Sequence, residues 1–393
     1  MKKLLNNLLR NKFGLEIREY KSYPSATTLK PDGDSKGSVL ISYIIDPFLV
    51  DDESRISNSH THHWESYLMA KAFLQMGYEV DVVSYLDDSF VPEKSYAVFI
   101  AARTNFARIA RLLNSDCVKI AHLDTSHWLF NNAAVLNRSN DVLQAHGVAL
   151  ASFKFIEYNW AVEYADYATV LGNQFTVDTY SYSQKPIYRI PISSCNSYPW
   201  NEEKDFELCR GNFLWFGSKG FVHKGLDLVL DAFVKMPDCH LYVCGPISDE
   251  PDFEKAFDRE LYHTQNIHTL GWIDVDSDEF LDIAGRCIAL VYPSCAEGGG
   301  GSVIQCMHAG LIPLVSYESS VDISDDYGFI LNEFSVEEVI DKVRSVFDLP
   351  TDRLERMSRK AWEFARDNHT RERFSKVFKQ RMQTIIETHI RRP

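Results

Sequence analysis

Short apolar runs alternate along this chain with longer segments in which apolar residues recur every three or four positions. The first strand is predicted over 38–45. A helix follows over 64–76, and Gly77 ends it before a second strand over 78–84. One stripe of this helix carries Trp64, Leu68, Ala72 and Met76. An apolar stripe of this kind predicts a helix packed on a sheet, so the three segments form a βαβ unit. Further strands of the same domain are predicted over 96–101, 118–123 and 167–171.

The alternation of strands and helices stops once and then restarts. We expect the strand over 167–171 to close the first sheet, because residues 191–206 (PISSCNSYPWNEEKDF) predict a connector between domains. The strands of a second domain are predicted near 213–217, 240–245, 267–271, 287–292 and 312–316. Two parallel sheets follow from this pattern, which is an α/β fold with two Rossmann-like domains. The predicted domains extend over 38–192 and 193–365.

The composition is that of an ordinary soluble protein, with 45% hydrophobic and 24% charged residues. A net charge of −14, from 55 acidic and 41 basic residues, argues against nucleic-acid binding and confines any phosphate site to a local basic pocket. The eight cysteines form no CxxC pair, so we expect reduced core thiols of a cytoplasmic protein, and neither disulfides nor a zinc site. No stretch approaches the ~20 apolar residues of a membrane span.

Residues 1–37 differ from the rest of the chain. A helix over residues 2–13 would gather four leucines and Phe13 on one face, with four basic residues around it. Such a basic amphipathic segment could make a peripheral contact with the inner face of a membrane, or it could pack on the protein, which is the commoner use of an amphipathic helix. Residues 21–37 combine prolines, glycines and charges, and they predict a linker.

Residues 291–316 (VYPSCAEGGGGSVIQCMHAGLIPLVS) carry the strongest indication of function. A strand ends at Pro293, and Glu297 then precedes four glycines and a short apolar helix. Glycines let a ligand approach the main chain, and the free N–H groups of a first helical turn attract an anion such as a phosphate. Glu297 and Gln305 lie eight positions apart, and both side chains could point into the crevice above the strand ends. The other candidates for contact with such a ligand are Gly298, Gly299, Gly300, Gly301, Ser302 and Val303.

A second motif lies upstream, in residues 213–233 (FLWFGSKGFVHKGLDLVLDAF). An apolar strand leads into the loop 217–225, and the residues after it have the i, i+3, i+4, i+7 spacing of a helix packed on a sheet. The candidate residues of this loop are Gly217, Ser218, Lys219 and Lys224. Taken by itself, each motif could also be a surface loop, a glycine-rich turn in one case and two solvated lysines in the other.

Together the two motifs resemble those of retaining glycosyltransferases of the GT-B fold, in particular family four. The signature P-S-x-x-E-G-x-x-x-x-x-x-E of that family is matched with one change, because Glu297 stands at the first glutamate and Gln305 at the second. The other family motif, G-R-x-x-x-x-K-G after a strand, is matched at Lys224. Its arginine position falls on Ser218 or Lys219, depending on the alignment.

The resemblance implies that the two domains face each other across a cleft and that the C-terminal helices, with residues 366–393, cross back to the first domain. It implies transfer of a sugar from a UDP- or GDP-sugar to a saccharide, lipid-linked or other acceptor with retention of configuration, without a cofactor or metal. Glu297 would hold hydroxyls of the donor sugar, and Gln305 would accept a hydrogen bond from the ribose. Lys224 and Lys219 would neutralise the diphosphate as its bond to the sugar breaks.

In the first domain, the family has a Gly-Gly before the first helix, where this chain has the loop 57–66 (SNSHTHHWES). Three histidines lie in it: His60, His62 and His63. Such a cluster without a carboxylate at ligand spacing is most often a polar loop. The functional alternative is a place in the lining of the interdomain cleft, for which His63 is our candidate.

Two other candidates of the first domain lie near strand ends. Family members often place a histidine at a strand end, facing the donor sugar. His122 fits that position and His127 is the runner-up, and either could instead be a loop histidine without a ligand. Asn173 follows the strand over 167–171, where the hinge of the cleft is expected.

Residues 274–280 (DVDSDEF) contain the D-x-D pairs that bind manganese in the other glycosyltransferase fold, and they begin like an EF-hand. An EF-hand needs glycine at its sixth position and glutamate at its twelfth, where this chain has Glu279 and Gly285. The segment lies between a strand and a helix, so Asp276 or Ser277 is expected to cap the helix, and no metal is expected.

Two other functions stay open. A non-catalytic glycosyltransferase-like module, which would bind a sugar nucleotide or a partner enzyme, is favoured by Gln305, by the missing arginine and by the missing Gly-Gly. A sugar-nucleotide epimerase of the GT-B fold is disfavoured, because the motifs resemble those of the retaining transferases.

Overall fold

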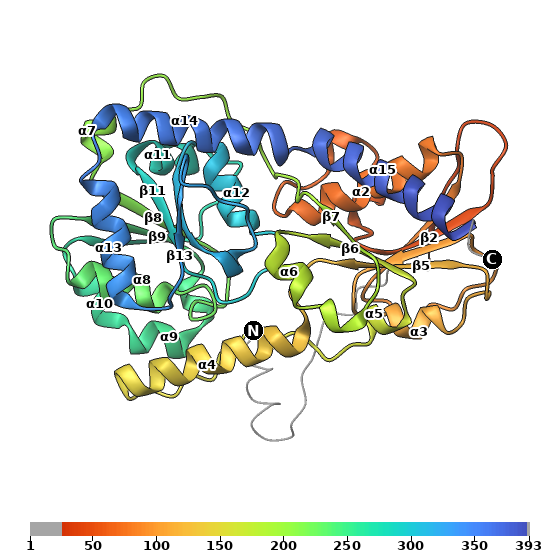
Figure 1. Ribbon diagram of the computed structural model, residues 1–393, viewed down its shortest axis with the longest axis horizontal. Helices are drawn as coiled ribbons and strands as arrows, with labels where there is room; N and C mark the ends of the chain where they lie inside the picture. Colours follow the sequence, from red (N-terminus) through yellow and green to blue (C-terminus); the bar gives the residue numbers. More distant parts are fainter. Residues whose placement is uncertain (1–25, 391–393) are drawn as a thin grey trace.

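The computed structural model of the protein describes residues 26–390, which form two lobes with one β-sheet each (Figure 1). The predicted amphipathic segment 2–13 lies outside these residues, as does the first part of the predicted linker 21–37. Within the described range, no helix has the length and apolar character needed to cross a membrane.

The first sheet has seven strands in the order β1-β3-β2-β4-β5-β6-β7, and all neighbours are parallel except β1 and β3. The strands are β1 (Thr27–Leu29), β2 (Ser38–Tyr43), β3 (Glu79–Ser84), β4 (Val98–Ala101), β5 (Val118–Leu123), β6 (Tyr167–Leu171) and β7 (Ile187–Ile190). The helices and 3-10 turns of this part of the chain are η1 (Asp46–Phe48), η2 (Glu53–Arg55), α2 (Thr61–Gln75), α3 (Phe106–Ala110), α4 (Trp128–His146), α5 (Ala161–Tyr164), α6 (Gln174–Asp178) and η3 (Ser181–Ser183).

Both edges of this sheet differ from the prediction. The strand β7, not β6, closes the sheet. Only Ile190 of β7 is buried, so the strand lacks the continuous apolar run that marks an inner parallel strand. At the other edge, β1 lies inside the predicted linker, and its sequence TTL is too short for a period of two to be visible.

The second sheet has six parallel strands in the order β10-β9-β8-β11-β12-β13. The strands are β8 (Asn212–Phe216), β9 (His240–Cys244), β10 (Ile267–Gly271), β11 (Ala289–Tyr292), β12 (Ile312–Ser316) and β13 (Phe329–Leu331). The winding starts at β8, moves out to β10 and returns to β11 beside β8, which is a doubly wound sheet. Ligands of such sheets bind beyond the carboxyl ends of the strands where the winding reverses, and here that point lies between β8 and β11.

Helices cover both faces of the second sheet, which explains why its inner strands are apolar throughout. All four residues of β11 are fully buried, as are Phe213 and Trp215 of β8. The five strands predicted for this domain are confirmed, and the three-residue edge strand β13 is an addition. The helices and turns are α7 (Phe206–Cys209), α8 (Leu226–Val234), η4 (Ile247–Asp249), α9 (Pro251–Ala256), α10 (Asp258–His263), α11 (Asp278–Arg286), α12 (Gly301–His308), η5 (Tyr317–Ser319) and α13 (Val336–Phe347).

The last two helices connect the lobes, as expected (Figure 1). The helix α14 (Thr351–Asn368) packs on the second domain, where the Ser358 hydroxyl donates to the carbonyl of Gly310. After a short break, α15 (Arg371–Ile390) lies against α2 of the first domain. The rings of Phe378 and Phe73 meet there at 5.8 Å. The first and last of the described residues thus lie on the same domain.

The helix α4 makes a second connection, because it leaves the first lobe and lies along the second (Figure 1). Its Arg138 forms a buried ion pair with Asp227 of α8, at 2.5 Å. The last residue of α4, His146, contacts Asp231 of α8 at 2.9 Å. The residues that follow α4 are therefore carried to the boundary between the domains.

Candidate active site between the two domains

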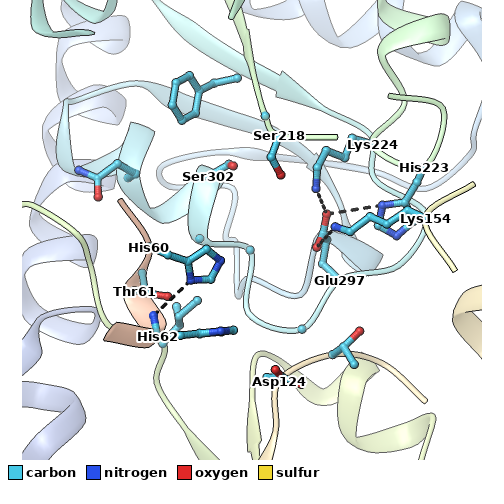
Figure 2. A pocket seen from close by; sticks show the side chains of 18 of the residues that line it. His60, Thr61, His62, Asp124, Lys154, Ser218, His223, Lys224, Glu297 and Ser302 are labelled. Carbon is cyan, nitrogen blue, oxygen red and sulfur yellow. Dashed lines mark hydrogen bonds and ion pairs between the residues drawn. The ribbon is translucent and has the colours of Figure 1, made fainter. Parts of the chain in front are cut away.

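A cavity of about 370 Å³ lies between the two domains, where the carboxyl ends of strands from both sheets meet (Figure 2). We call two sets of its lining residues the C-terminal wall and the N-terminal wall. The C-terminal wall consists of Gly217, Ser218, His223, Lys224, Glu297, Gly298, Gly300, Gly301, Ser302 and Gln305. The N-terminal wall consists of His60, Thr61, His62, Arg103, Asp124 and Lys154.

The glycine-rich segment between β11 and α12 forms the centre of the C-terminal wall. Gly300 caps α12 with a φ of +58°, and a side chain there would lie 2.5 Å from the carbonyl oxygen of Ser319. The backbone N–H of Ile304 donates to the carbonyl of Gly300, at 3.1 Å. The N–H groups of the residues before Ile304 precede this helical ladder, so the beginning of α12 can bind an anion.

Two residues of this segment, Gly299 and Val303, lie behind the wall and not in it, contrary to expectation. A side chain on Gly299 would meet Ile192 and Leu171, and Val303 is fully buried in the core. At Gly298 the two domains almost touch, because an added Cβ would lie 2.2 Å from the Cα of Thr125. Only a glycine fits at that point of the cavity.

Glu297 lies at the meeting point of five polar side chains, and Figure 2 shows three of them, Lys154, His223 and Lys224. One of its carboxylate oxygens accepts hydrogen bonds from three of them, at 3.0–3.1 Å: Lys224, Tyr292 and Ser294. His223 lies 3.8 Å from the same oxygen, and Lys154 lies 3.8 Å from the other one. The carboxylate is thus held in one orientation by groups from both domains.

These neighbours fix the charges of the C-terminal wall. Burial by itself would raise the pKa of Glu297, but Lys154 and Lys224 outweigh it and hold that pKa well below the usual range. Burial opposes the charge of Lys224 as well, and the carboxylate of Glu297 nevertheless raises the pKa of that lysine. For His223, burial and the positive charge of Lys154 lower the pKa to about 3, so its ring is neutral.

The loop after β8 contributes Gly217, Ser218 and Lys224 to the cavity, as predicted. The backbone N–H of Gly220 donates to the buried carboxylate of Glu250, which holds the loop against the domain. The expected place of Lys219 is corrected. Its side chain is 62% exposed, does not line the cavity and forms an ion pair with Asp249 at 3.0 Å.

The second lysine beside Glu297 is Lys154, which the sequence did not put forward. It belongs to residues 151–160, between α4 and α5, and reaches the C-terminal wall from the first domain (Figure 2). Burial and the nearby charge of Lys224 lower its pKa to about 7, although Glu297 acts in the opposite direction. No local motif marks this residue, because its neighbours in the sequence, Phe153 and Phe155, are aromatic.

The N-terminal wall brings together side chains from separate parts of the chain. His60 and His62 flank Thr61 at the beginning of α2, with ring centroids 4.2 Å apart. Burial, with the nearby charge of His63, lowers the pKa of His60 to about 4. Burial also lowers the pKa of His62 well below its ordinary value. Both rings are therefore neutral hydrogen-bonding groups.

The charged part of this wall is the ion pair of Arg103 with Asp124, which follow β4 and β5. His62 lies 3.8 Å from the carboxylate of Glu65 in the core behind it. Burial raises the pKa of Glu65 to about 7. Apart from the histidine loop, none of these residues was a candidate from the sequence.

Three histidines that the sequence put forward lie elsewhere. His63 does not line the cavity, and its ring contacts the carbonyl of His60 at 3.3 Å. His122 is 1% exposed inside β5, where Nδ1 lies 2.9 Å from the hydroxyl of Thr169. The strand ends at Leu123, as predicted, so His122 lies within it, and its side chain is buried in the core. His127 caps α4, accepts from the N–H of Leu129 and also lies outside the cavity.

The side chains of Gln305 and Asn173 form hydrogen bonds with residues far away in the sequence. Gln305 lines the cavity, but its amide donates to the carbonyl of Asn196 (3.0 Å) and to the hydroxyl of Tyr198 (2.7 Å). Its oxygen accepts from the N–H of Asn196, at 3.2 Å. Asn173 is fully buried between the domains, where its amide donates to the carbonyl of Tyr317 at 2.9 Å. It therefore connects the two domains but does not line the cavity.

The short acidic segment 274–280 has the structure expected of a helix start. Ser277 caps α11, its hydroxyl accepts from the N–H of Phe280 at 3.2 Å, and Glu279 lies in the first turn.

Comparison with known proteins agrees with this geometry. Residues 209–364 match the family model described as "Glycosyl transferases group 1", over less than half of the chain. No curated protein sequence matches the chain significantly. The match covers both motifs of the C-terminal wall.

Solved structures show the same fold at low sequence identity. Sucrose-phosphate synthase from Thermosynechococcus elongatus superposes with a TM-score of 0.60 at 11% identity, over 89% of this chain and 99% of that chain. HepE from Anabaena, in complex with UDP-glucose, gives 0.57 at 11% identity, over 88% and 100%. TarM from S. aureus gives 0.53 at 11% identity, over 83% of this chain, which spans only 58% of the TarM chain. The fold is therefore GT-B, and the family match supports a glycosyltransferase.

Proposed function

We propose that the protein transfers a sugar from a nucleotide-sugar donor to a saccharide, lipid-linked or other acceptor with retention of configuration. One observation carries the proposal. The anchored carboxylate of Glu297, two lysines and the beginning of α12 surround one cavity at the point where the winding of the second sheet reverses. A UDP-sugar is the first donor to test, because HepE and TarM were solved with UDP-glucose and UDP.

The chemical difficulty of the reaction lies in separating an anionic diphosphate from a sugar with oxocarbenium character. Lys224 and Lys154 would neutralise the diphosphate, together with the N–H groups of Gly301 and Ser302 at the start of α12. The lysines lie on opposite domains, so both contact the diphosphate only while the domains are closed. Closure would also exclude the water that would otherwise hydrolyse the donor.

Glu297 would hold hydroxyls of the donor sugar, since its charge is kept and three hydrogen bonds fix its orientation. On the opposite wall, the carboxylate of Asp124 is engaged by Arg103 and is a poor nucleophile. We therefore propose front-side substitution, in which the departing phosphate takes the proton of the acceptor hydroxyl. The neutral rings of His60 and His62 would contact the sugar from the first domain.

A second candidate is a non-catalytic module that binds a sugar nucleotide. The hydrogen bonds of Gln305 favour it, because both ends of the amide are engaged at the position where the family resemblance expects a ribose ligand. In that case the cavity would bind the donor without turning it over.

Thermal unfolding with UDP-, GDP- and ADP-sugars separates these candidates when it is combined with an assay for nucleotide release. A donor at 100 times its dissociation constant adds about 2.7 kcal/mol to the free energy of unfolding. Stabilisation with turnover, and retention seen by NMR in the product, would support the transferase. Stabilisation without turnover, with or without added acceptors, would support the module. No stabilisation by any of the three donors would overturn both.

A further inference from the structure

Residues 151–160 present different side chains to the cavity and to solvent. The segment forms no regular secondary structure, and exposed residues alternate with partly buried ones from 151 to 157. Lys154 and Ile156 are partly buried and line the cavity. Phe153 and Phe155 between them are 38% and 47% exposed, and their rings stack at 5.0 Å. Lys154 is thus turned into the cavity, whereas Phe153 faces solvent and Phe155 is both exposed and part of the cavity lining.

The exposed aromatic side chains continue along the segment. Tyr158 is 58% exposed and Trp160 is 46% exposed, with ring centroids 5.4 Å apart. Trp128, at the start of α4, packs against Tyr158 at 5.2 Å. We call Phe153, Phe155, Tyr158 and Trp160 the aromatic strip. Exposed aromatic side chains gathered on one short segment are typical of an interaction site.

The strip is held in place, so its exposure does not result from a loose loop. On one side, the carboxylate of Asp252 in the second domain accepts from the N–H groups of Ala151 (2.6 Å) and Ser152 (2.9 Å). On the other side, the side chain of Asn132 forms two hydrogen bonds of 2.9 Å with the backbone of Ile156. The rings are thus presented by a backbone that both domains and α4 fix.

We propose that the aromatic strip binds the sugar chain of the acceptor, so that a saccharide of several units lies along it with its reactive end at the cavity. This rests on the proposed function and names the class of its acceptor. The strip is continuous with the cavity, because Phe155 belongs to the strip and also lines the cavity. The electron-rich face of an aromatic ring suits the C–H face of a sugar ring, and Tyr and Trp add a polar group at the edge.

The charge of the strip favours a neutral saccharide over an anionic membrane surface. The only basic side chain of residues 151–160, Lys154, is turned into the cavity. Glu157 lies exposed between the rings, and Glu163 follows at the next helix. Binding to anionic lipids requires basic groups on the surface, and this surface carries acidic ones.

The test uses the full-length protein and linear neutral oligosaccharides of glucose, galactose and N-acetylglucosamine, one to six units long. Binding is measured by saturation-transfer NMR and by titration of tryptophan fluorescence. We expect affinity to increase with chain length. The triple variant Phe155→Ala/Tyr158→Ala/Trp160→Ala should lose on the order of tenfold or more in affinity for the hexamer. The double variant Tyr158→Ala/Trp160→Ala, which leaves the cavity lining intact, should show the same thermal shift with UDP-sugars as the wild type.

Two further variants control for structure. Tyr262→Ala removes an equally exposed aromatic ring on α10, outside the cavity lining, and should leave oligosaccharide binding unchanged. Tyr158→Phe/Trp160→Phe keeps the ring faces and should retain most of the hexamer affinity, which a merely structural defect would not predict.

The proposal is overturned if no oligosaccharide binds, if affinity is independent of length, or if the triple variant binds the hexamer as the wild type does. It is also overturned if the strip mediates binding to phosphatidylglycerol-phosphatidylethanolamine vesicles, or self-association of the protein, in place of saccharide binding. Failure of the proposed function is a different result, in which oligosaccharides bind the strip but no nucleotide sugar stabilises the protein.

Discussion

The C-terminal wall of the cavity comes from two loops that follow neighbouring strands of one sheet, whereas the N-terminal wall is assembled from four places in the chain. In the first case, the loops after β8 and β11 each contain several wall residues in sequence. In the second case, the loop before α2 and the single residues Arg103, Asp124 and Lys154 come together only in the fold. Backbone N–H groups that bind one ligand together are neighbours in the sequence, so they form a local motif. Side chains can be brought to one ligand from distant positions of the chain.

The two walls also differ in how firmly their charges are fixed. In the C-terminal wall, Glu297 and Lys224 stabilise each other's charged forms. In the N-terminal wall, burial lowers the pKa of His60 and His62, and it brings the pKa of Lys154 to about 7. We infer that the C-terminal wall supplies permanent charges, whereas the N-terminal wall, apart from the ion pair of Arg103 with Asp124, supplies neutral or adjustable groups.

The largest effect on turnover is expected from the removal of a permanent charge. Lys224→Met keeps most of the buried stem but removes the cation that would stabilise the departing diphosphate. We expect turnover of the donor to fall on the order of 10²–10³-fold, by analogy with the loss of a single oxyanion donor. The rate of nucleotide release under saturating donor measures this.

The matched control is Lys219→Met, in the same loop but exposed and paired with Asp249. It should turn over like the wild type, and equal losses in the two variants would contradict the role of Lys224. Removing one member of a buried pair also costs about 3–5 kcal/mol of stability. Circular dichroism at the assay temperature must therefore show that the Lys224→Met protein is folded.

The next effect concerns the contact between the walls. Gly298→Ala would place a Cβ 2.2 Å from the backbone of Thr125, which cannot move as a flexible side chain can. Overpacking of this kind costs about 1–3 kcal/mol, and here it would act on the closed arrangement of the domains. We expect turnover to fall about 10–100-fold, with little change in the unfolding temperature of either domain.

Gly285→Ala, in α11, is the control for replacing a glycine with alanine. The nearest atom to its added Cβ is 3.5 Å away, so the new methyl group has room. That variant should keep its activity and gain up to about 1 kcal/mol in helix stability. If Gly298→Ala were as active as Gly285→Ala, closure at this point would not be part of catalysis.

Contiguous motifs explain what the sequence could predict. The residues 293–305 and 217–225 fix backbone geometry locally, so Glu297, Lys224 and most of the glycines were found. The edge strand β7 was missed because only one of its residues is buried. Lys154 was missed because its position depends on α4 crossing to the second domain, which is a tertiary fact that no local pattern contains.

A smaller effect on donor affinity is expected from a change of pH, which alters the charge of Lys154 in the N-terminal wall. The pKa of Lys154 is about 7, against an ordinary value of 10.5, so above pH 7 the empty site holds this lysine mostly uncharged. Binding of a diphosphate would favour the charged form and take up a proton. Donor affinity should therefore fall as the pH rises from 7 to 9, by at most tenfold per pH unit for one proton.

Lys154→Arg sharpens this prediction, because an arginine stays charged throughout this range. Its donor affinity, measured by titration calorimetry, should depend less on pH than that of the wild type. Glu65 has a pKa of about 7 and titrates in both proteins, so the difference between them isolates Lys154. Identical pH profiles would show that Lys154 does not contact the diphosphate.

The smallest expected effect separates the two roles open to Gln305. Gln305→Leu leaves the backbone of Asn196 and the hydroxyl of Tyr198 without their partner, which should cost about 1–3 kcal/mol of unfolding free energy. Gln305→Glu also loses the amide donor and should be destabilised, but it keeps an acceptor for a ribose hydroxyl. If Gln305 holds the ribose, donor affinity falls only in the leucine variant.

Tyr198→Phe, which alters the same network outside the cavity lining, should lower stability without changing donor affinity. Equal donor affinity in all four proteins would place the ribose elsewhere and leave Gln305 as a link between α12 and the interdomain connector.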